Sequence, residues 1–125
     1  GRNNPLKLPT SADVVSYLNS NFPKIKLLYN GAPSTSQTYT NDSLDGKLSD
    51  YKFILFIGMQ YSNSRCSLIQ PKVLFDTQTS NSARAILYHG SSIMAQVYKV
   101  DDTHVSIWFD TSIITGGALR IYGVF

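Results

Sequence analysis

Residues 91–110, SSIMAQVYKVDDTHVSIWFD, decide the fold, because apolar and polar side chains alternate along both halves of this stretch. A period of two is typical of a β-strand with one face in the core. The two Asp residues between the halves favour a turn, so the stretch predicts a β-hairpin. One set of alternating positions is wholly apolar and consists of Ile93, Ala95, Val97, Val105, Ile107 and Phe109.

The length of the hairpin loop sets its register. A three-residue loop over 101–103 places Val97 opposite Ile107 and keeps the apolar side chains on one face. A two-residue loop would pair Tyr98 with Val105 and mix the two faces, because a slip of one residue turns every side chain over. The sequence therefore predicts the three-residue loop.

The second face of the hairpin mixes one tryptophan with polar side chains. Each polar group would need its own partner if this face were buried, so we expect the face to be at least partly wet. An indole stacks on a sugar ring, and the polar neighbours supply hydrogen bonds to hydroxyl groups. Burial of Trp108 between subunits stays open as the alternative. The face is predicted to carry Met94, Gln96, Tyr98, His104, Ser106, Trp108 and Asp110, and the candidate ligand-binding residues are Trp108, Tyr98, Gln96, His104 and Asp110.

The rest of the chain after Pro23 also has a period of two, interrupted by turn signals. Pro71 is expected to force an edge or a break in its strand, because proline cannot donate to the ladder. The pattern predicts strands at 24–29, 37–40, 51–59, 65–75, 83–88, 91–100, 104–110 and 119–125.

The first 23 residues hold the helix candidate of the chain. Thr10 is a suitable N-cap, with Asp13 three residues later as a short variant of the capping box. Pro23 is expected to stop the helix. Residues 1–23 are therefore predicted as an N-terminal segment with a short helix, and 24–125 as the main domain. The apolar stripe of the helix consists of Val14, Tyr17, Leu18 and Phe22.

Composition supports an all-β fold. The chain has 125 residues, 42% of them hydrophobic, which suits one domain with its own core. All eight acidic residues are aspartates and eight residues are tyrosines, so good helix formers are few and strand formers are many. We predict an antiparallel, jelly-roll-like β-sandwich of about seven or eight strands.

The charge pattern argues against two classes of partner. The net charge is +3, but the lysines and arginines stand singly and form no stripe that would follow a phosphate backbone. We therefore expect no nucleic-acid binding. The longest apolar run, 53–57, is far too short to span a bilayer, so we expect no membrane insertion.

The sequence offers no catalytic or metal-binding motif. His89 and His104 are the two histidines, and neither has a partner at metal-ligand spacing. Cys66 is the single cysteine and is expected to be a buried, inert thiol. Asp101 and Asp102 would suit calcium or a carboxylate pair, but a polar hairpin tip explains them better. We expect no enzymatic activity, no metal and no cofactor.

Three segments together carry a resemblance to a known family. They are KLLYNG at 26–31, Leu44 followed by LSDYKFILF at 48–56, and LRIYGVF at 119–125. In this order they resemble the distal β-sandwich domains of tail-fibre and receptor-binding proteins of tailed bacteriophages, over about a hundred residues from Lys24 onward.

The resemblance implies a non-enzymatic tip of the fibre. Such a domain would be a homotrimer on the virion, attached to the rest of the tail fibre, assembled in the host cytoplasm and exposed outside the cell. Its partner would be a bacterial surface polysaccharide or an outer-surface protein. An apolar patch on the second hairpin face would also favour trimers, because monomers rarely leave such a patch exposed.

Two other functions fit the same residues. One is a carbohydrate-binding module attached to a hydrolase, and the other is a structural trimerisation cap without a ligand. The N-terminal helix would be a link to a fibre shaft or a packing element around the threefold axis.

Overall fold

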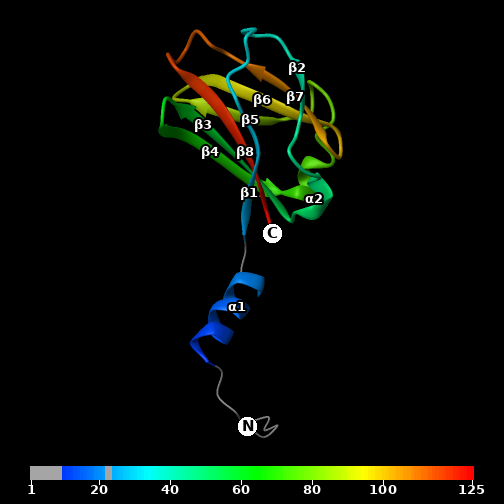
Figure 1. The fold of residues 1–125 in the computed structure, drawn as a ribbon. Coiled ribbons are helices and arrows are strands. Elements are labelled where there is room, and N and C mark those ends of the chain that lie inside the picture. Colours follow the sequence, from blue (N-terminus) through cyan, green and yellow to red (C-terminus); the bar gives the residue numbers. More distant parts are fainter. Residues whose placement is uncertain (1–9, 22–23) are drawn as a thin grey trace, which may run out of the picture.

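The computed structural model describes residues 10–21 and 24–125 and shows a sandwich of two four-stranded antiparallel sheets (Figure 1). One sheet has the order β1-β8-β3-β4 and the other β2-β7-β6-β5. The prediction of an all-β antiparallel sandwich is confirmed. The strands are β1 (Ile25–Gly31), β2 (Thr40–Ser43), β3 (Phe53–Gln60), β4 (Asn63–Pro71), β5 (Ala85–His89), β6 (Ser92–Asp101), β7 (His104–Phe109) and β8 (Gly117–Val124), and the helical segments are α1 (Ser11–Asn21), a 3-10 turn (Leu48–Asp50) and α2 (Lys72–Phe75).

The strands near the two ends of the chain pair with one another. β1 pairs with β8 in one sheet, and β2 pairs with β7 in the other, as expected of a jelly-roll-like fold. The strands between them form local hairpins, β3 with β4 and β5 with β6 and β7. The first sheet therefore combines two long-range pairings, β1 with β8 and β3 with β8, with one hairpin. The second sheet combines one long-range pairing with two hairpins.

The predicted hairpin register is confirmed. Val97 lies opposite Ile107 and Ala95 lies opposite Phe109. The predicted three-residue loop is wrong, because Asp101 pairs with His104 and only residues 102 and 103 form the turn. A β-bulge between Lys99 and Asp101 keeps the apolar side chains in register in its place. The inward side chains from Ala95 to Phe109 are fully buried, because this register turns them toward the other sheet. Ile93 was also predicted to face inward, but it is only half-buried. Most of the second face is half-buried, as its mixed composition predicts.

One residue of the second face was placed wrongly. Met94 is fully buried, with its sulfur 3.6 Å from the Cys66 thiol of the other sheet. The cause is a β-bulge: Leu87 pairs with Ala95 and the next residue, Tyr88, pairs with Ile93. Met94 is the extra residue, and the bulge re-aims its side chain into the core.

Two predicted strand boundaries are also wrong. β2 begins at Thr40, not at Gln37, because Gln37 has a positive φ of 57° that ends an extended strand. The strand predicted over 65–75 ends at Pro71, where we expected a break, and α2 follows in place of further strand.

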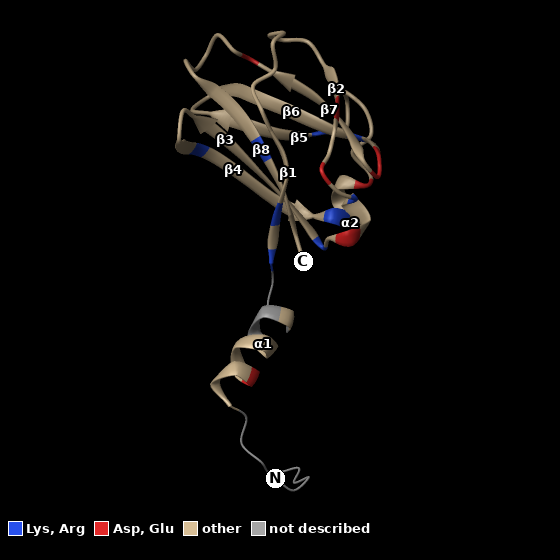
Figure 2. Ribbon diagram, in the orientation of Figure 1, with Lys and Arg blue, Asp and Glu red and all other residues tan. Residues whose placement is uncertain are grey.

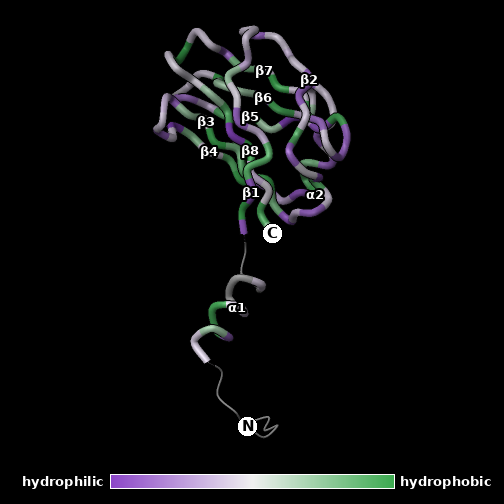
Figure 3. Tube along the Cα trace, viewed as in Figure 1, coloured by the Kyte–Doolittle hydropathy of each residue, from purple (hydrophilic) through white to green (hydrophobic). Residues whose placement is uncertain are grey.

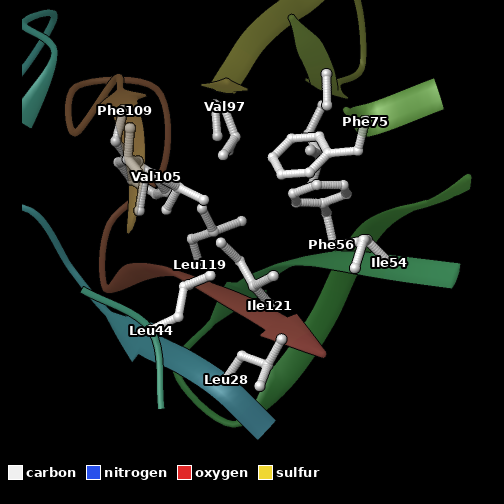
Figure 4. Packing of buried hydrophobic residues seen from close by; sticks show 14 of the residues in the cluster. Leu28, Leu44, Ile54, Phe56, Phe75, Val97, Val105, Phe109, Leu119 and Ile121 are labelled. Carbon is white, nitrogen blue, oxygen red and sulfur yellow. The ribbon is translucent and has the colours of Figure 1, made fainter. Parts of the chain in front are cut away.

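The core fills the space between the two sheets. Figure 4 shows side chains from both sheets and from α2 pointing toward one another. The largest of them include Phe56 on β3, Phe75 on α2 and Phe109 on β7, all fully buried. Phe56 and Phe75 meet edge to face, with ring centres 5.4 Å apart. Each such side chain contributes about 1.5–3 kcal/mol on burial.

The N-terminal helix has the predicted cap. The backbone N–H of Asp13 donates to Thr10 Oγ1 at 3.1 Å, and the N–H of Thr10 donates to Asp13 Oδ2 at 3.0 Å. These reciprocal bonds satisfy donors that the first turn leaves free. Phe22 and Pro23, the expected end of the helix, lie outside the described residues. None of the helices in the described ranges is long and apolar enough to cross a membrane.

Asp76, directly after α2, joins that helix to the second sheet. Its carboxylate bridges Lys72 at 2.8 Å and Lys99 of β6 at 2.7 Å. Burial raises the pKa of Asp76, but hydrogen bonds and charge from the two ammonium groups outweigh burial and hold that pKa below its ordinary value. The ionised carboxylate is therefore the form that the fold stabilises.

Replacing Asp76 with Asn is expected to lower the free energy of unfolding by about 0.5–1 kcal/mol at pH 7. A depressed folded pKa adds stability above the unfolded value near pH 4, and this stability is lost as pH falls through the folded pKa. Urea unfolding should thus separate Asp76→Asn from the wild type at pH 7 and bring them together near pH 2. Asp45→Asn, at an exposed loop position, is the control, and an equal loss in that variant would contradict the assignment.

Candidate ligand-binding face

The outer surface of the β2-β7-β6-β5 sheet brings the central predicted residues together. Gln96 lies directly opposite Trp108, and Tyr98 lies opposite Ser106. Trp108, Gln96 and Tyr98 are half-buried, while Ser106 is buried between them and the neighbouring strand. Because directly opposite residues share a face, the indole, the amide and the phenol ring form one continuous surface.

Tyr39, which immediately precedes β2, completes this surface. Its hydroxyl donates a hydrogen bond to Gln96 Oε1 at 3.2 Å, and its ring meets the Tyr98 ring edge to face at 5.1 Å and 61°. The bond orients the amide, with its oxygen toward Tyr39 and its NH₂ group, which has two donors, on the opposite side. The aromatic face is defined here as Tyr39, Gln96, Tyr98, Ser106 and Trp108.

Burial keeps the Tyr39 hydroxyl protonated. It raises the pKa of Tyr39, and the nearby positive charge of Arg84 opposes that rise in part. A phenol with a raised pKa stays a neutral hydrogen-bond donor throughout the physiological range. The contact with Gln96 is therefore present at any pH at which the protein would meet a ligand.

Arg84 brings a positive charge to the border of the aromatic face. It directly precedes β5, whose first residue Ala85 pairs with Val97, so Arg84 stands beside Tyr98 at the edge of the sheet. Its Nη1 donates to the backbone carbonyl oxygen of Asn81. Its Nε is buried and has no hydrogen-bond partner among the described residues.

His104 lies at the hairpin end of the same face. Its Nδ1 is 2.9 Å from Asp101 Oδ1 and 3.0 Å from Thr103 Oγ1. The Thr103 backbone N–H and, next, the His104 side chain lower the pKa of Asp101. The imidazole therefore helps to close the hairpin loop, and it flanks the aromatic face without a described contact to it.

Asp110 closes a turn at the opposite end of β7. Only 8% of the residue is exposed. Its Oδ1 accepts the N–H of Ser112 at 2.9 Å and the Ser112 hydroxyl at 2.6 Å, and its Oδ2 accepts the Gln37 amide at 3.1 Å. The Ser112 hydroxyl, followed by its N–H, lowers the pKa of Asp110. The structure thus gives this carboxylate a structural role, holding the loop beside Trp108.

The two aspartates of the hairpin tip do not act as a pair. Asp101 binds Thr103 and His104, whereas Asp102 accepts the N–H and the hydroxyl of Ser49 at 2.8 and 2.7 Å. The Ser49 hydroxyl is the main cause of the lowered pKa of Asp102. Across residues 10–21 and 24–125, no three His, Cys or acidic side chains are grouped so that they would hold a metal ion.

Cys66 is half-buried on β4, beside Met94 of the facing sheet. Burial raises the pKa of this thiol, with a smaller opposing effect from a backbone hydrogen bond at Gly58. A raised pKa disfavours the thiolate that a nucleophile needs, which agrees with the expectation of an inert thiol. The residue is half-buried, however, and not buried as expected.

The structure therefore brings Trp108, Tyr98 and Gln96 together, places His104 at the border and uses Asp110 in a turn. Sequence reasoning missed Tyr39, although the residue falls within the strand predicted over 37–40. Comparisons with protein-family models, with curated proteins and with solved structures find no match to this chain.

Proposed function

We propose that this chain is a non-enzymatic receptor-binding domain that recognises a host cell-surface glycan as a homotrimer at the tip of a phage tail fibre. One observation carries the glycan part of the proposal. The aromatic face places three aromatic rings around an amide that a hydrogen bond has already oriented.

The chemistry of this face suits a sugar. Aromatic side chains with a polar tip present a large contact area at low entropic cost, because few torsions must be fixed. The indole of Trp108 stacks on the apolar face of a pyranose ring, and the Gln96 amide and the tyrosine hydroxyls bond to sugar hydroxyls. Since Tyr39 already contacts both Gln96 and Tyr98, little reorganisation precedes binding.

The phage part of the proposal rests on the three segments that resemble tail-fibre domains. Residues 26–31 belong to β1, residues 48–56 lead into β3, and residues 119–125 cover most of β8. These strands are neighbours in one sheet, in the order β1-β8-β3. The three segments therefore lie together in the fold although they are distant in the sequence. This supports treating them as one motif of the tail-fibre domains and not as three unrelated strands.

Trp108→Ala tests the proposal. We expect binding to host cells or to the glycans of an array to weaken at least tenfold, about 1.4 kcal/mol, because the indole is the largest contact of the face. Circular dichroism and mass in solution should stay unchanged. Tyr61→Ala, an exposed aromatic in the turn between β3 and β4, is the matched control and should bind normally.

Four other results would change the assignment. Dissociation of the assembly by Trp108→Ala would place Trp108 in a subunit interface. Unchanged binding in that variant would move the ligand site to another face. A wild-type chain that binds no glycan and no host cell would favour the structural cap, and a monomer that binds soluble glycan would favour a carbohydrate-binding module.

A further inference from the structure

The outer surface of the β1-β8-β3-β4 sheet is apolar on all four of its strands. Two rows of directly opposite residues cross the sheet, and each row has one member on every strand. These eight residues are called the apolar face. The first row is Ile25, Val124, Phe53 and Pro71, and the second row is Leu27, Tyr122, Leu55 and Ile69.

The apolar face is large for the surface of a monomer. Ile25 is 61% exposed, Ile69 56%, Phe53 41% and Leu27 40%. With the half-buried members added, the contiguous apolar surface is on the order of 500 Å², near the upper end of what monomers leave in water. A surface of this size normally marks a contact with another molecule.

No side chain in the two rows is charged, and the Tyr122 hydroxyl is their one side-chain polar group. The next row across the sheet changes character, with Asn30, Arg120 and Ser67 beside Ile57. Figure 2 shows β3, at the centre of the two rows, without a charged residue along its whole length. The apolar face therefore has a polar border, as the core and rim of an interface do.

The sequence of β3 independently indicates a strand that is covered on both faces. Residues 53–57 are apolar without interruption, and Figure 3 shows hydrophobic colour along β3. An antiparallel strand with one wet face alternates, as β6 does from residue 95 to residue 98, whereas a continuous apolar run is typical of a strand buried on both sides. Within the described chain, the core covers only one side of β3.

The helix α1 leads toward the same sheet, through β1, and also exposes apolar side chains. Val14 is 43% exposed and Val15 56%. A helix of 11 residues is marginal in water without a packing partner. A partner that covered the apolar face and α1 together would stabilise both.

We infer that the apolar face is the surface through which copies of this chain associate. Around a threefold axis each copy turns this face toward the other two copies, and the faces suit one another because they are equally flat and uncharged. With α1 added, the contact approaches the roughly 800 Å² per partner of a stable interface. This inference deepens the homotrimer of the proposed function and rests on it, and it leaves the aromatic face free for the ligand.

The test is a pair of double variants compared with the full wild-type chain by sedimentation equilibrium at micromolar concentration. Phe53→Glu/Ile69→Glu places two charges in the apolar face and should reduce the mass to that of one 13.9 kDa chain. Val73→Glu/Val100→Glu adds the same charges at exposed apolar positions outside the face, 72% and 49% exposed, and should keep the wild-type mass. Circular dichroism checks that both variants fold.

The outcomes separate the inference from the proposed function. A monomeric wild type, or a 53/69 variant of unchanged mass, would overturn the inference. Sedimentation of a monomeric wild type with anionic phosphatidylserine vesicles would overturn it in favour of a membrane. A dimer that the 53/69 variant dissociates would support this face but contradict the trimer. Both proposals would be supported by two results together. The 53/69 variant would be a monomer that still binds soluble glycan, and the Trp108→Ala variant would be assembled but would not bind it.

Discussion

Replacing Phe56 with alanine is expected to destabilise the fold by about 3–5 kcal/mol, because it removes a fully buried ring from the middle of β3. The ring packs edge to face on Phe75 of α2, at 5.4 Å and 60°. Phe75 is also fully buried, so it would lose its partner and line the new cavity. A domain of this size has a total stability of only about 5–15 kcal/mol, so the loss is a large part of it.

Urea unfolding followed by circular dichroism measures this loss. Val73→Ala on α2 is the control, because Val73 is largely exposed and should change stability by less than about 0.5 kcal/mol. A loss in Phe56→Ala as small as that of the control would show that the Phe56 ring is not packed in the core against Phe75.

The register of the β6-β7 hairpin was predictable because the sequence features that determine it lie close together in the chain. The alternation on both strands and the turn chemistry all lie within twenty residues, and they agree with one another. The pairing of Val97 with Ile107 follows from them. The capping box of Thr10 and Asp13 was predictable for the same reason. The length of the hairpin loop was not predictable in the same way, because a bulge at Val100 takes the place of the third loop residue.

The bulge at Met94 was not predictable from alternation. A period-two pattern counts one residue per step on each strand, and a bulge inserts one residue that no pattern marks. The methionine fits there because its flexible side chain fills the space between Gly58 and Cys66. The composition of 93–97 is equally compatible with either placement of this residue.

Tyr39 and the apolar face depend on contacts between distant parts of the chain. Tyr39 reaches Gln96 only because the segment before β2 lies along β7. The row from Ile25 to Pro71 likewise exists only once β1 pairs with β8 and β8 with β3. The sequence led us to expect the surface for self-association on the second hairpin face, whereas the structure puts the larger uncharged apolar surface on the other sheet.

Gly123→Ala is expected to destabilise the protein by about 1–3 kcal/mol, although an alanine in a strand interior is normally better than a glycine by about 0.5–1 kcal/mol. The expected change in stability is a loss and not a gain, because a Cβ at position 123 would lie within 2.6 Å of ring atoms of Tyr51. Tyr51 is buried, and it stacks edge to face on Phe125 at 4.8 Å, so its ring has little room to move away. Any shift of β8 to make room would also disturb the rows of the apolar face on its other side.

A double-mutant cycle with Tyr51→Leu isolates this contact. Tyr51→Leu alone should destabilise the fold, since it leaves a cavity over Gly123. In the double variant the added methyl group enters that cavity, so the cost of Gly123→Ala should shrink by at least 1 kcal/mol in urea unfolding. Equal costs of Gly123→Ala with Tyr51 and with Leu at position 51 would show that the ring does not set the requirement for glycine. If Gly123→Ala instead stabilised the protein, the close packing of Tyr51 on β8 would itself be wrong.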